Sequence, residues 1–404
     1  MRESDVLVAG AGPAGAALAL ILASRGISTV LVERQHDFHR EFRGQAMMPS
    51  GLEVLEQLGI DLKSVPHRRP TRMRGYLNGR AFIDLAIEPD AFGRHPPLTV
   101  SQPHLLEHLV ECASRAPAFS FVRGGTVRDL LESDGRVRGL RVRTDQGERE
   151  FSARLVVGAD GRASVVRRRG AFPVKERGAP MDIVWFKLPW PSAWSETQLR
   201  AYLGGGHLLI ALPAPDGLLQ VAWVILKGTY GSLRDRGVEG WARAMAEHVD
   251  PDFAAYLLAN ISQISRPFLL DSETDRVEGW ARPGVLLVGD AAHTMSPVGG
   301  QGLNLALRDA VVAANHLVPS LSAGASDAEL DAAAERVEAE RLPEIERIQS
   351  LAAQPPRVVM GRRFYHRWLR RAIASLVSTE FGRARAAPVG EVFFNGVTEV
   401  TLRV

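Results

Sequence analysis

The first 33 residues carry two apolar runs with the period of β-strands and a helical pattern between them. The apolar run that follows Asp5 ends in the sequence G-x-G-x-x-G at residues 10–15. Residues 16–25 repeat apolar side chains at helical spacing, and residues 28–33 form a second strand pattern that ends on an acid. Strand, glycines, helix and strand at this spacing predict a βαβ dinucleotide-binding unit.

A second strand-turn-helix pattern lies late in the chain. Apolar residues 285–288 stop at Gly289-Asp290, and a glycine-rich turn leads into residues 303–317, which are apolar at helical spacing. Three glycines within four positions let the backbone approach a ligand closely, and the helix start behind them leaves free N–H groups. Asp290, at the end of the strand, can accept hydrogen bonds from a sugar hydroxyl. The pattern predicts a second cofactor-binding turn.

The middle of the chain has the pattern of antiparallel strands. Short strands are predicted around the turn at residues 78–79, and a three-strand meander at residues 126–131, 136–143 and 148–155. Four more strands are predicted at residues 182–188, 198–203, 206–212 and 218–226, before amphipathic helices at residues 238–248 and 253–261. The whole pattern predicts an α/β fold, with an antiparallel sheet inserted between two nucleotide motifs.

Each residue of the first glycine motif has a chemical task. Gly10 makes the tight turn, Gly12 lets a pyrophosphate near the backbone, and Gly15 lets helix and strand pack. Glu33, at the end of the second strand, would bind ribose hydroxyls, and its charge disfavours a 2′-phosphate. The unit is therefore expected to hold FAD or NAD rather than NADP.

Composition narrows the class of protein. The 404 residues suit two domains and an appendage, and 46% hydrophobic with 24% charged residues is typical of a globular protein. The net charge of +3 does not indicate a nucleic-acid-binding protein. The chain has a single cysteine, Cys112, which excludes an internal disulfide. No apolar span is long enough to cross a membrane, and glycines interrupt the apolar start at residues 6–22. We expect a cytoplasmic protein.

Several segments also resemble a known family. The sequence G-D-A-A-H-x-x-x-P-x-x-G-Q-G-x-N at residues 289–304 resembles the second flavin-binding motif of the FAD-dependent aromatic hydroxylases, the p-hydroxybenzoate hydroxylase-like single-component monooxygenases. The sequence R-G-x-x-x-x-P-x-x-L-E-x-L-x-x-L-G at residues 43–59 and the D-G segment at residues 158–167 resemble further segments of these enzymes. The resemblance covers nearly the whole chain.

The resemblance implies an α/β fold with a Rossmann-like FAD-binding domain of the glutathione-reductase type, an inserted antiparallel-sheet substrate domain and C-terminal helices. Its implied FAD-binding domain comprises residues 1–75, 95–176 and 271–345. The implied substrate domain comprises residues 76–94 and 177–270, and residues 346–404 form the C-terminal helical segment.

The resemblance also implies a set of cofactor-binding residues. These are Gly10, Gly12, Ala14, Gly15, Glu33, Arg34, Arg43, Gln102, Val127, Asp160, Asp290, Pro297, Gly300, Gln301, Gly302, Leu303 and Asn304. In the family, cations at the positions of Arg34, Arg40 and Arg43 also meet the nicotinamide coenzyme, although Arg40 also fits a solvated loop. Gln102 is either a flavin contact or a helix-cap residue, and Asp160 also fits a purely structural turn cap.

Candidates for catalysis and substrate contact are fewer. Pro297 is a candidate catalytic residue because the resemblance implies that Pro297 and Val298 border the reacting edge of the flavin through their backbone. On the inserted sheet, the polar or aromatic candidates are His207, Tyr202, Trp223 and Gln220, with ordinary packing as the alternative for each. We select His207 as the second candidate catalytic residue. The sequence does not decide which sheet face meets the substrate.

The implied function is that of an FAD-dependent monooxygenase. It would take hydride from NAD(P)H and use O2 to hydroxylate an aromatic or similar electron-rich small molecule through a flavin C4a-hydroperoxide. The alternatives are a flavin-dependent halogenase or a prenyl reductase of the same fold, or a flavin-binding protein without oxygenase activity. We expect a small aromatic substrate and O2 as partners, no nucleic acid, no stable membrane insertion, no metal, and a monomer or homodimer.

The basic segment 357–385 has two interpretations. Its eight arginines, interleaved with aromatic residues, form a basic amphipathic pattern that suits a membrane surface or a partner. Alternatively, a C-terminal helix packs these aromatic side chains on the FAD-binding domain, and we favour this interpretation.

Overall fold

The strand patterns of the two nucleotide motifs come together in one sheet. The structure is a computed structural model that describes residues 4–38, 45–88, 95–176, 178, 181–194, 197–204, 206–361 and 364–404. The strands of the first sheet run in the order β19-β20-β11-β1-β2-β8, and the predicted meander extends it through β10 and β9. Their bounds are β1 Ser4–Ala9, β2 Thr29–Glu33, β8 Phe119–Arg123, β9 Thr126–Ser133, β10 Arg136–Thr144, β11 Gly147–Gly158, β19 Ala281–Arg282 and β20 Val285–Leu287.

Helices from distant parts of the chain pack together beside this sheet. Helix α1 (Pro13–Ser24) is rich in alanine and buries nearly all its residues, which lets α3 (Gln102–Ala113) and α8 (Gln301–Ser322) approach it. Helix α2 (Pro49–Gln57) packs on α8, and the short α4 (Val165–Arg169) lies on β9. The parallel pairing of β1 with β2 and β11 places the ends of these three strands at one edge.

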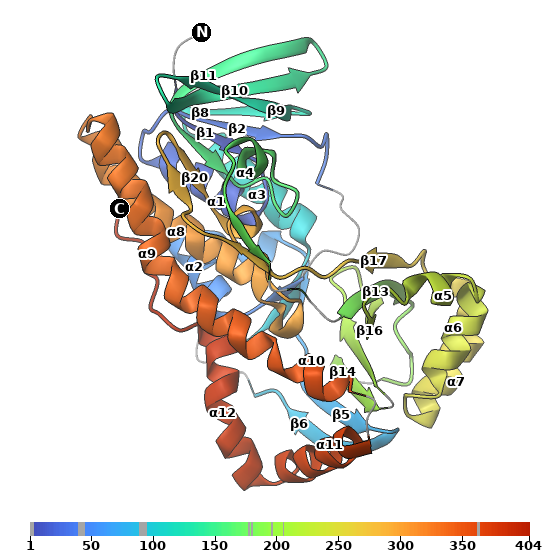
Figure 1. Cartoon of the computed structure of the whole chain (residues 1–404). Helices are drawn as coiled ribbons and strands as arrows, with labels where there is room; N and C mark the ends of the chain where they lie inside the picture. The colour runs from blue at the N-terminus through green and yellow to red at the C-terminus, as the bar shows by residue number, and fades with distance from the viewer. Residues whose placement is uncertain are drawn as a thin grey trace.

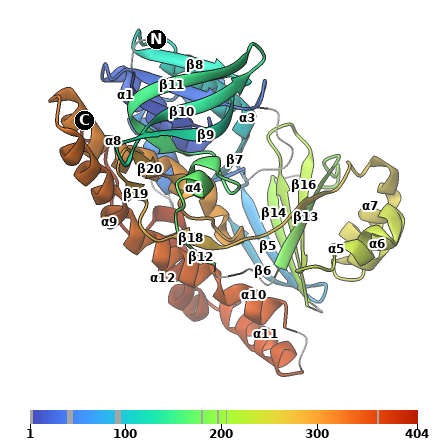
Figure 2. The same ribbon diagram turned by 45° about the horizontal axis from the view of Figure 1, so that its top comes forward.

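The second sheet contains the predicted hairpin at residues 78–79 and the four predicted strands. Its order is β17-β13-β16-β15-β14-β5-β6, and it forms a separate lobe (Figures 1 and 2). Its strands are β5 Arg72–Leu77, β6 Arg80–Ala86, β13 Met181–Leu188, β14 Gln198–Gly204, β15 His207–Pro213, β16 Leu219–Leu226 and β17 Phe268–Leu270. Its helices are α5 Tyr230–Arg234, α6 Gly237–Ala246 and α7 Pro251–Ala259.

The two faces of the second sheet have different neighbours. Val184, Phe186 and Trp223 point toward α6 and α7 and share one core with Trp241. The opposite face carries Ile183 and Val224 and belongs to another cluster. That cluster includes Met360 and the half-buried Val298, which belongs to the second glycine motif. This second face, which we call the inner face, is therefore the one that contacts the predicted cofactor turn.

Short elements connect the two lobes. Strands β3 (Ala46–Met47), β7 (Leu98–Val100) and β4 (His67–Arg68) form a small sheet, and β12 (Val174–Glu176) pairs with β18 (Asp275–Val277). Single 3-10 turns lie at Leu62–Ser64 (η1), Ile261–Gln263 (η3), Gly289–Ala291 (η4) and Val298–Gly300 (η5).

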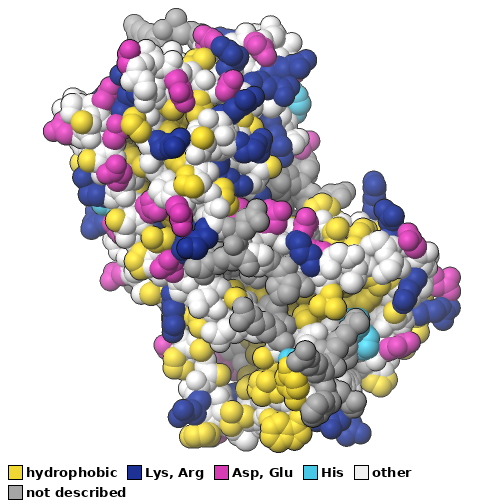
Figure 3. All heavy atoms as spheres, viewed as in Figure 1, with side chains coloured by type: hydrophobic (Ala, Val, Ile, Leu, Met, Phe, Trp, Pro, Cys, Tyr) yellow, Lys and Arg dark blue, Asp and Glu magenta, His cyan; other side chains and the backbone are white. Residues whose placement is uncertain are grey.

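The C-terminal part is helical, as expected, but its aromatic residues are not packed as predicted. Helix α9 (Asp327–Ala352) begins at a capping box formed by Ser326 and Glu329 and runs along the first lobe. It is followed by α10 (Gln354–Val359), α11 (Phe364–Val377) and α12 (Glu380–Asn395) (Figure 1). Trp368 is 73% exposed and Phe381 66% exposed, so neither side chain packs on the first lobe. Hydrophobic side chains gather at the lower edge of Figure 3, where α11 and α12 lie.

No helix in the described ranges combines the length and the apolar character that crossing a membrane requires.

A fully buried set of charges joins α8 to α9 and to the last residues of the chain. Asp309 on α8 accepts a hydrogen bond from Arg341 Nε at 2.8 Å, and Arg341 also pairs with Glu344. Glu344 binds Arg308 Nη2 at 2.9 Å and accepts a hydrogen bond from the backbone N–H of Val397 at 2.6 Å. Because each buried charge has an opposite partner, the two helices are held in one register.

Removal of one member of this set is expected to be costly. In Glu344→Gln, two buried guanidinium groups lose their shared carboxylate, and we expect a loss of about 3–5 kcal/mol of unfolding free energy. The control is Glu340→Gln, one turn earlier on α9, where the His316 pair is partly exposed and is worth at most about 1 kcal/mol. Urea unfolding followed by circular dichroism measures both. Equal losses in the two variants would contradict this assignment.

The set also predicts a pH dependence. Burial opposes ionisation of Asp309, but the charges of His293 and Arg341 lower its pKa to about 2. A folded-state pKa below the unfolded value of about 3.9 stabilises the fold above about pH 4 and loses that effect as the pH falls toward 2. The difference in melting temperature between the wild type and Asp309→Asn should therefore narrow as the pH falls from about 4 toward 2. A constant difference would exclude this contribution.

Candidate functional site

The first glycine turn has the geometry that its sequence predicts. Gly10 has φ +98°, and an added Cβ would lie 2.5 Å from the carbonyl oxygen of Ala159. A Cβ on Gly15 would overlap the carbonyl oxygen of Gly10, so only glycine permits this contact between turn and helix. Gly12, the N-cap of α1, is different, because its added Cβ would meet only Ala159 O, at 3.9 Å. The backbone at Gly12 therefore faces open space.

Glu33 closes this turn from the neighbouring strand. One carboxylate oxygen accepts a hydrogen bond from Ala11 N at 2.9 Å, and the other accepts one from Gln35 N at 3.0 Å. The residue is only 3% exposed. The acid therefore lies against the glycine turn, where a ribose beside the pyrophosphate would pass.

The second glycine turn ends at the start of α8. Gly299 and Gly300 have φ values of +78° and +64°, and α8 begins at Gln301. A Cβ on Gly302 would meet only Asp290 Oδ1, at 3.9 Å, so this first turn of the helix also faces open space. The first backbone N–H groups of a helix have no intrahelical acceptor and lie at the positive end of its dipole.

The two turns meet although nearly three hundred residues separate them. A Cβ on Gly289 would lie 3.1 Å from the Cβ of Ala14, in the first turn of α1, and 3.6 Å from that of Ala306 in α8. Small residues at all three positions allow this approach. Two glycine-lined helix starts thus lie side by side, as binding of one extended cofactor requires.

The D-G segment joins them as a third element. Asp160 follows β11, and the Cα of Asp160 would lie 2.7 Å from a Cβ on Gly10. Its carboxylate accepts hydrogen bonds from the Ser164 hydroxyl and from the backbone N–H groups of Val165, at 2.6 Å, and Val166, at 3.2 Å. Burial raises the pKa of the Asp160 carboxyl, and these hydrogen bonds oppose that effect. The side chain caps α4, and the backbone supports the first glycine turn.

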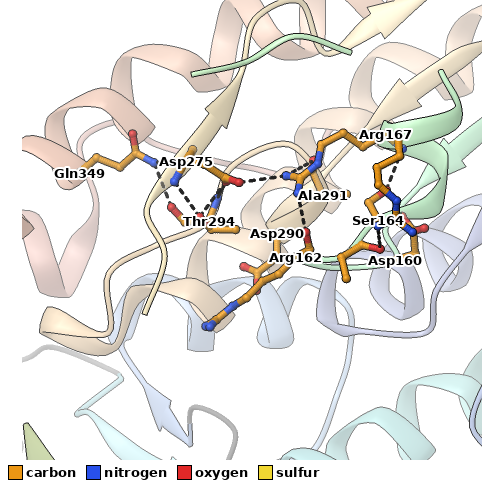
Figure 4. Close-up of polar contacts among 11 residues, drawn as sticks. Asp160, Arg162, Ser164, Arg167, Asp275, Asp290, Ala291, Thr294 and Gln349 are labelled. Carbon is orange, nitrogen blue, oxygen red and sulfur yellow. Dashed lines mark hydrogen bonds and ion pairs between the residues drawn. The ribbon is translucent and has the colours of Figure 1, made fainter. Parts of the chain in front are cut away.

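Arginines connect the D-G segment to the second motif (Figure 4). Arg162 Nε lies 3.4 Å from Asp290 Oδ2, in an ion pair that is about one-third exposed. Arg167 donates to Asp275 Oδ2 at 3.3 Å and to the carbonyl oxygen of Ala291 at 3.4 Å. These arginines fix the Gly289–Ala291 turn relative to β11.

Two polar residues of α8 hold the surrounding segments. Asn304 is fully buried; its Oδ1 accepts a hydrogen bond from Met48 N at 2.8 Å, and its Nδ2 donates to Gly300 O at 2.9 Å. Gln301 donates to the carbonyl oxygens of Gly299 and Phe393, so it ties the glycine turn to α12. Both side chains form hydrogen bonds within the protein, so a cofactor would contact the backbone at this turn.

The other predicted cofactor residues lie at different depths. Leu303 and Gln102 are buried, and Gln102 is the first residue of α3. Arg34 is exposed beside Glu33, whereas Arg40 and Arg43 lie outside the described residues. Val127 is buried on β9 and lines an open cavity of about 730 Å³. The cavity is also lined by Arg128, Asp129, Arg141, Arg143, Glu148, Val165, Arg168 and Arg169.

The two candidate catalytic residues are not brought together. Pro297 is half-buried in the turn before α8, next to Val298, which contacts the inner face of the second sheet. His207 lies on the opposite face, where its ring stacks on His248 at 4.0 Å between centroids and accepts a hydrogen bond from Trp223 Nε1 at 3.3 Å. His207 is thus placed in the helix-covered core rather than toward Pro297, because odd-numbered residues of β15 point to that core.

Some residues of this region were not identified from sequence. Asp309 Oδ2 accepts hydrogen bonds from Gly289 N at 3.0 Å and from His293 Nε2 at 2.7 Å, so it supports the cofactor turn from within α8. The available signal was a charged pair, Arg308 and Asp309, inside a helix that is otherwise apolar.

The residues present fit FAD. Gly12 and Gly302 leave backbone open at two adjacent helix starts, while Gly10, Gly15 and Gly289 are closed by protein contacts. Such helix starts bind phosphate and other negative groups. One of these two helix starts would receive the pyrophosphate of FAD, and the other would face the flavin ring.

The glycine contacts predict the effect of one methyl group. Gly15→Ala must displace the Gly10 turn, at a cost of about 1–3 kcal/mol, which corresponds to about 5- to 150-fold weaker FAD binding. The control, Gly231→Ala in α5, adds a Cβ with nothing within 4 Å and should leave binding unchanged. Titration of the apoprotein with FAD, followed by flavin fluorescence, measures both. Unchanged affinity in Gly15→Ala would show that this turn does not hold the cofactor.

Comparison with known proteins identifies the family of this chain. The family described as FAD binding domain matches residues 3–349. The 6-methylpretetramide 4-monooxygenase of Streptomyces rimosus is 32% identical over 383 residues, which cover 93% of this chain and 89% of that enzyme. A probable NADH-specific resorcinol 4-hydroxylase of Rhodococcus jostii is 29% identical over 364 residues, which are 88% of this chain and 66% of that protein.

A solved structure shows the same fold. The p-nitrophenol 4-monooxygenase PnpA from Pseudomonas putida superposes with a TM-score of 0.80 at 19% identity, over 98% of this chain and 99% of that one. The likeness at this identity concerns the fold, whereas the family match and the Streptomyces relative extend over most of the sequence. The chain is therefore a member of the FAD-dependent monooxygenase and aromatic hydroxylase family that carries this FAD binding domain.

Proposed function

We propose that this chain hydroxylates an aromatic or similarly electron-rich small molecule at the junction of its two lobes, with NAD(P)H and O2 as co-substrates. Two observations support the proposal. The start of α1 meets the segment before α8 at Ala14 and Gly289, and Val298, in the turn that leads into α8, contacts the inner face. Bound FAD supplies the hydride acceptance and the oxygen-atom transfer that no amino-acid side chain provides.

The first lobe binds and orients the cofactor. The open backbone at Gly12 and the start of α1 receive the pyrophosphate, and Glu33 receives a ribose. The start of α8 directs a positive dipole at the flavin ring and stabilises negative charge there. Asp290, whose Oδ1 lies next to Gly302, would accept a hydrogen bond from the cofactor's polyol chain.

The second lobe holds the substrate and keeps water out. The turn of Pro297 and Val298 provides a backbone border between the flavin ring and the inner face. That face is largely apolar, so an aromatic ring replaces water on it and is held against the cofactor. On this proposal the protein acts by orientation and exclusion of water rather than through a dedicated acid or base, and His207 has no role in the reaction.

The alternatives give different products. A halogenase would incorporate bromide or chloride, a prenyl reductase would consume hydride without O2, and a redox-silent flavin protein would not oxidise NAD(P)H. A related enzyme acts on 6-methylpretetramide and another on resorcinol, as their names state. Phenolic rings are therefore the first compounds to test.

Purified protein loaded with FAD should oxidise NAD(P)H faster when a phenolic compound is present. With ¹⁸O2, the product should gain one ¹⁸O atom, detected by mass spectrometry, and chloride or bromide in the buffer should not be incorporated. The matched control is the wild-type apoprotein without added FAD, which should show neither effect. Products without label, or with halogen, would refute hydroxylation, and a flavoprotein that never takes hydride would support the redox-silent alternative.

A further inference from the structure

The inner face of the second sheet is almost entirely apolar. Strand pairing places alternate residues of β13, β14, β15 and β16 on it. On β14 and β15 these are Leu199, Ala201, Leu203, Leu208, Ile210 and Leu212. Several of them, including Leu208 and Ile210, are only half-buried although they are apolar. A face of this kind, next to the cofactor turn, is prepared for an apolar ligand.

Two buried polar groups on this face have no hydrogen-bond partner within the described part of the chain. The indole N–H of Trp185 on β13 is buried and makes no hydrogen bond. Gln220 on β16 is 1% exposed, and its Oε1 is likewise buried and unpaired. A buried polar atom without a partner costs about 1–3 kcal/mol, so two such groups on one face indicate that a ligand completes them.

The two groups lie on neighbouring strands of the same face. Trp185 pairs with Ala222, and Lys187 pairs with Gln220, so Trp185 and Gln220 are diagonal neighbours. Diagonal neighbours in an antiparallel sheet are about 7–8 Å apart. This separation of the two residues lets their side chains contact opposite ends of one fused-ring aromatic compound, whereas substituents on a single ring lie closer together.

The charges on this face limit the charge that the ligand can carry. Among the described residues at inner-face positions of β13–β16, Lys187 is the one cation, and its ammonium group pairs with Asp216. The buried Arg200 lies on the opposite face, over the ring of Trp194 at 3.7 Å. A carboxylate on the ligand would lose water without gaining a cation. The ligand therefore carries uncharged oxygen groups.

We propose that Trp185 and Gln220 select an uncharged fused-ring phenol or aryl ketone as the substrate of this enzyme. The inference rests on the proposed function and specifies the substrate class of the same site. The indole of Trp185 is a donor only, so it binds a carbonyl or hydroxyl oxygen, and Gln220 accepts a hydrogen bond from a hydroxyl group at the other end. The two contacts position the rings on the apolar face beside Val298.

The probe is 2,6-dihydroxynaphthalene, with 2-naphthol, naphthalene and naphthalene-2-carboxylate for comparison. Binding to the FAD-loaded wild type is measured by the change in flavin absorbance. The affinity should be highest for 2,6-dihydroxynaphthalene, lower for 2-naphthol, and lowest for naphthalene and naphthalene-2-carboxylate. Trp185→Phe and Gln220→Leu should each weaken diol binding by about fivefold to tenfold. The affinity of each variant for naphthalene should stay within about twofold of the wild-type affinity, because these substitutions remove hydrogen bonds but leave the apolar contact.

Trp223→Phe is the matched control, since this indole is on the next strand but points into the opposite core. It should leave diol affinity unchanged in protein that retains FAD. Gln220→Met, which keeps the volume of the side chain, replaces Gln220→Leu if the latter does not retain FAD. Trp185→His, which keeps an N–H donor, should restore part of the diol affinity.

The outcomes separate this inference from the proposed function. Substrate-dependent NAD(P)H oxidation in the wild type, together with unaltered diol affinity in Trp185→Phe and Gln220→Leu, would overturn the inference and leave the function standing. Preferential binding of naphthalene-2-carboxylate would also overturn it, because it would require a cation. Absence of flavin-dependent NAD(P)H oxidation with any phenol would refute the function itself, whatever the affinities.

Discussion

The structure depends on one close approach, between the start of α1 and the turn that precedes α8. Ala14 and Gly289 are the points of contact, and any larger side chain would separate them. Asp309 maintains the approach from the other side, because its buried carboxylate binds Gly289 N, His293 and Arg341 together. The carboxylate is held ionised by these partners, so the cofactor turn, α8 and α9 are fixed as one unit.

The first lobe was predictable because its signals are local. Gly15 and Glu33 belong to one βαβ unit, where they contact Gly10 and Ala11, each within about twenty positions, and the structure has that unit as expected. The Gly299-Gly300 turn is local in the same sense. The sequence alone did not predict the hydrogen bonds between segments that are distant in the chain. An example is the bond that Met48 N donates to Asn304 Oδ1, 256 positions away.

The strands and helices of the second lobe were predicted, but the face of its sheet that meets the cofactor turn was not. Strand β16 is buried at seven of its eight positions, so the alternation that marks an outer and an inner face is absent from Leu219–Leu226. His207 was selected because it is polar, yet its position in β15 directs it into the core with His248. Side chains of β16 alternate in direction along the strand, and this alternation places Gln220 on the inner face. The contact of Val298 with the sheet identifies the face that meets the cofactor turn.

The C-terminal helices differ from expectation for a similar reason. Apolar periodicity predicts that a helix has an apolar face, but it does not identify the surface that covers it. In α11 and α12 the aromatic residues Trp368 and Phe381 remain exposed, while Arg370 is buried against backbone carbonyl oxygens of α10. Pairing between helices that are distant in sequence, as between Arg341 and Asp309, is equally invisible to a local pattern.

The most direct test of the account is a crystal structure of the protein with FAD. The account predicts one FAD per chain, with its pyrophosphate against residues 10–15 and its ring between the start of α8 and the inner face beside Pro297 and Val298. A flavin ring bound outside that junction, or a nucleotide that contacts only one of the two helix starts, would contradict it.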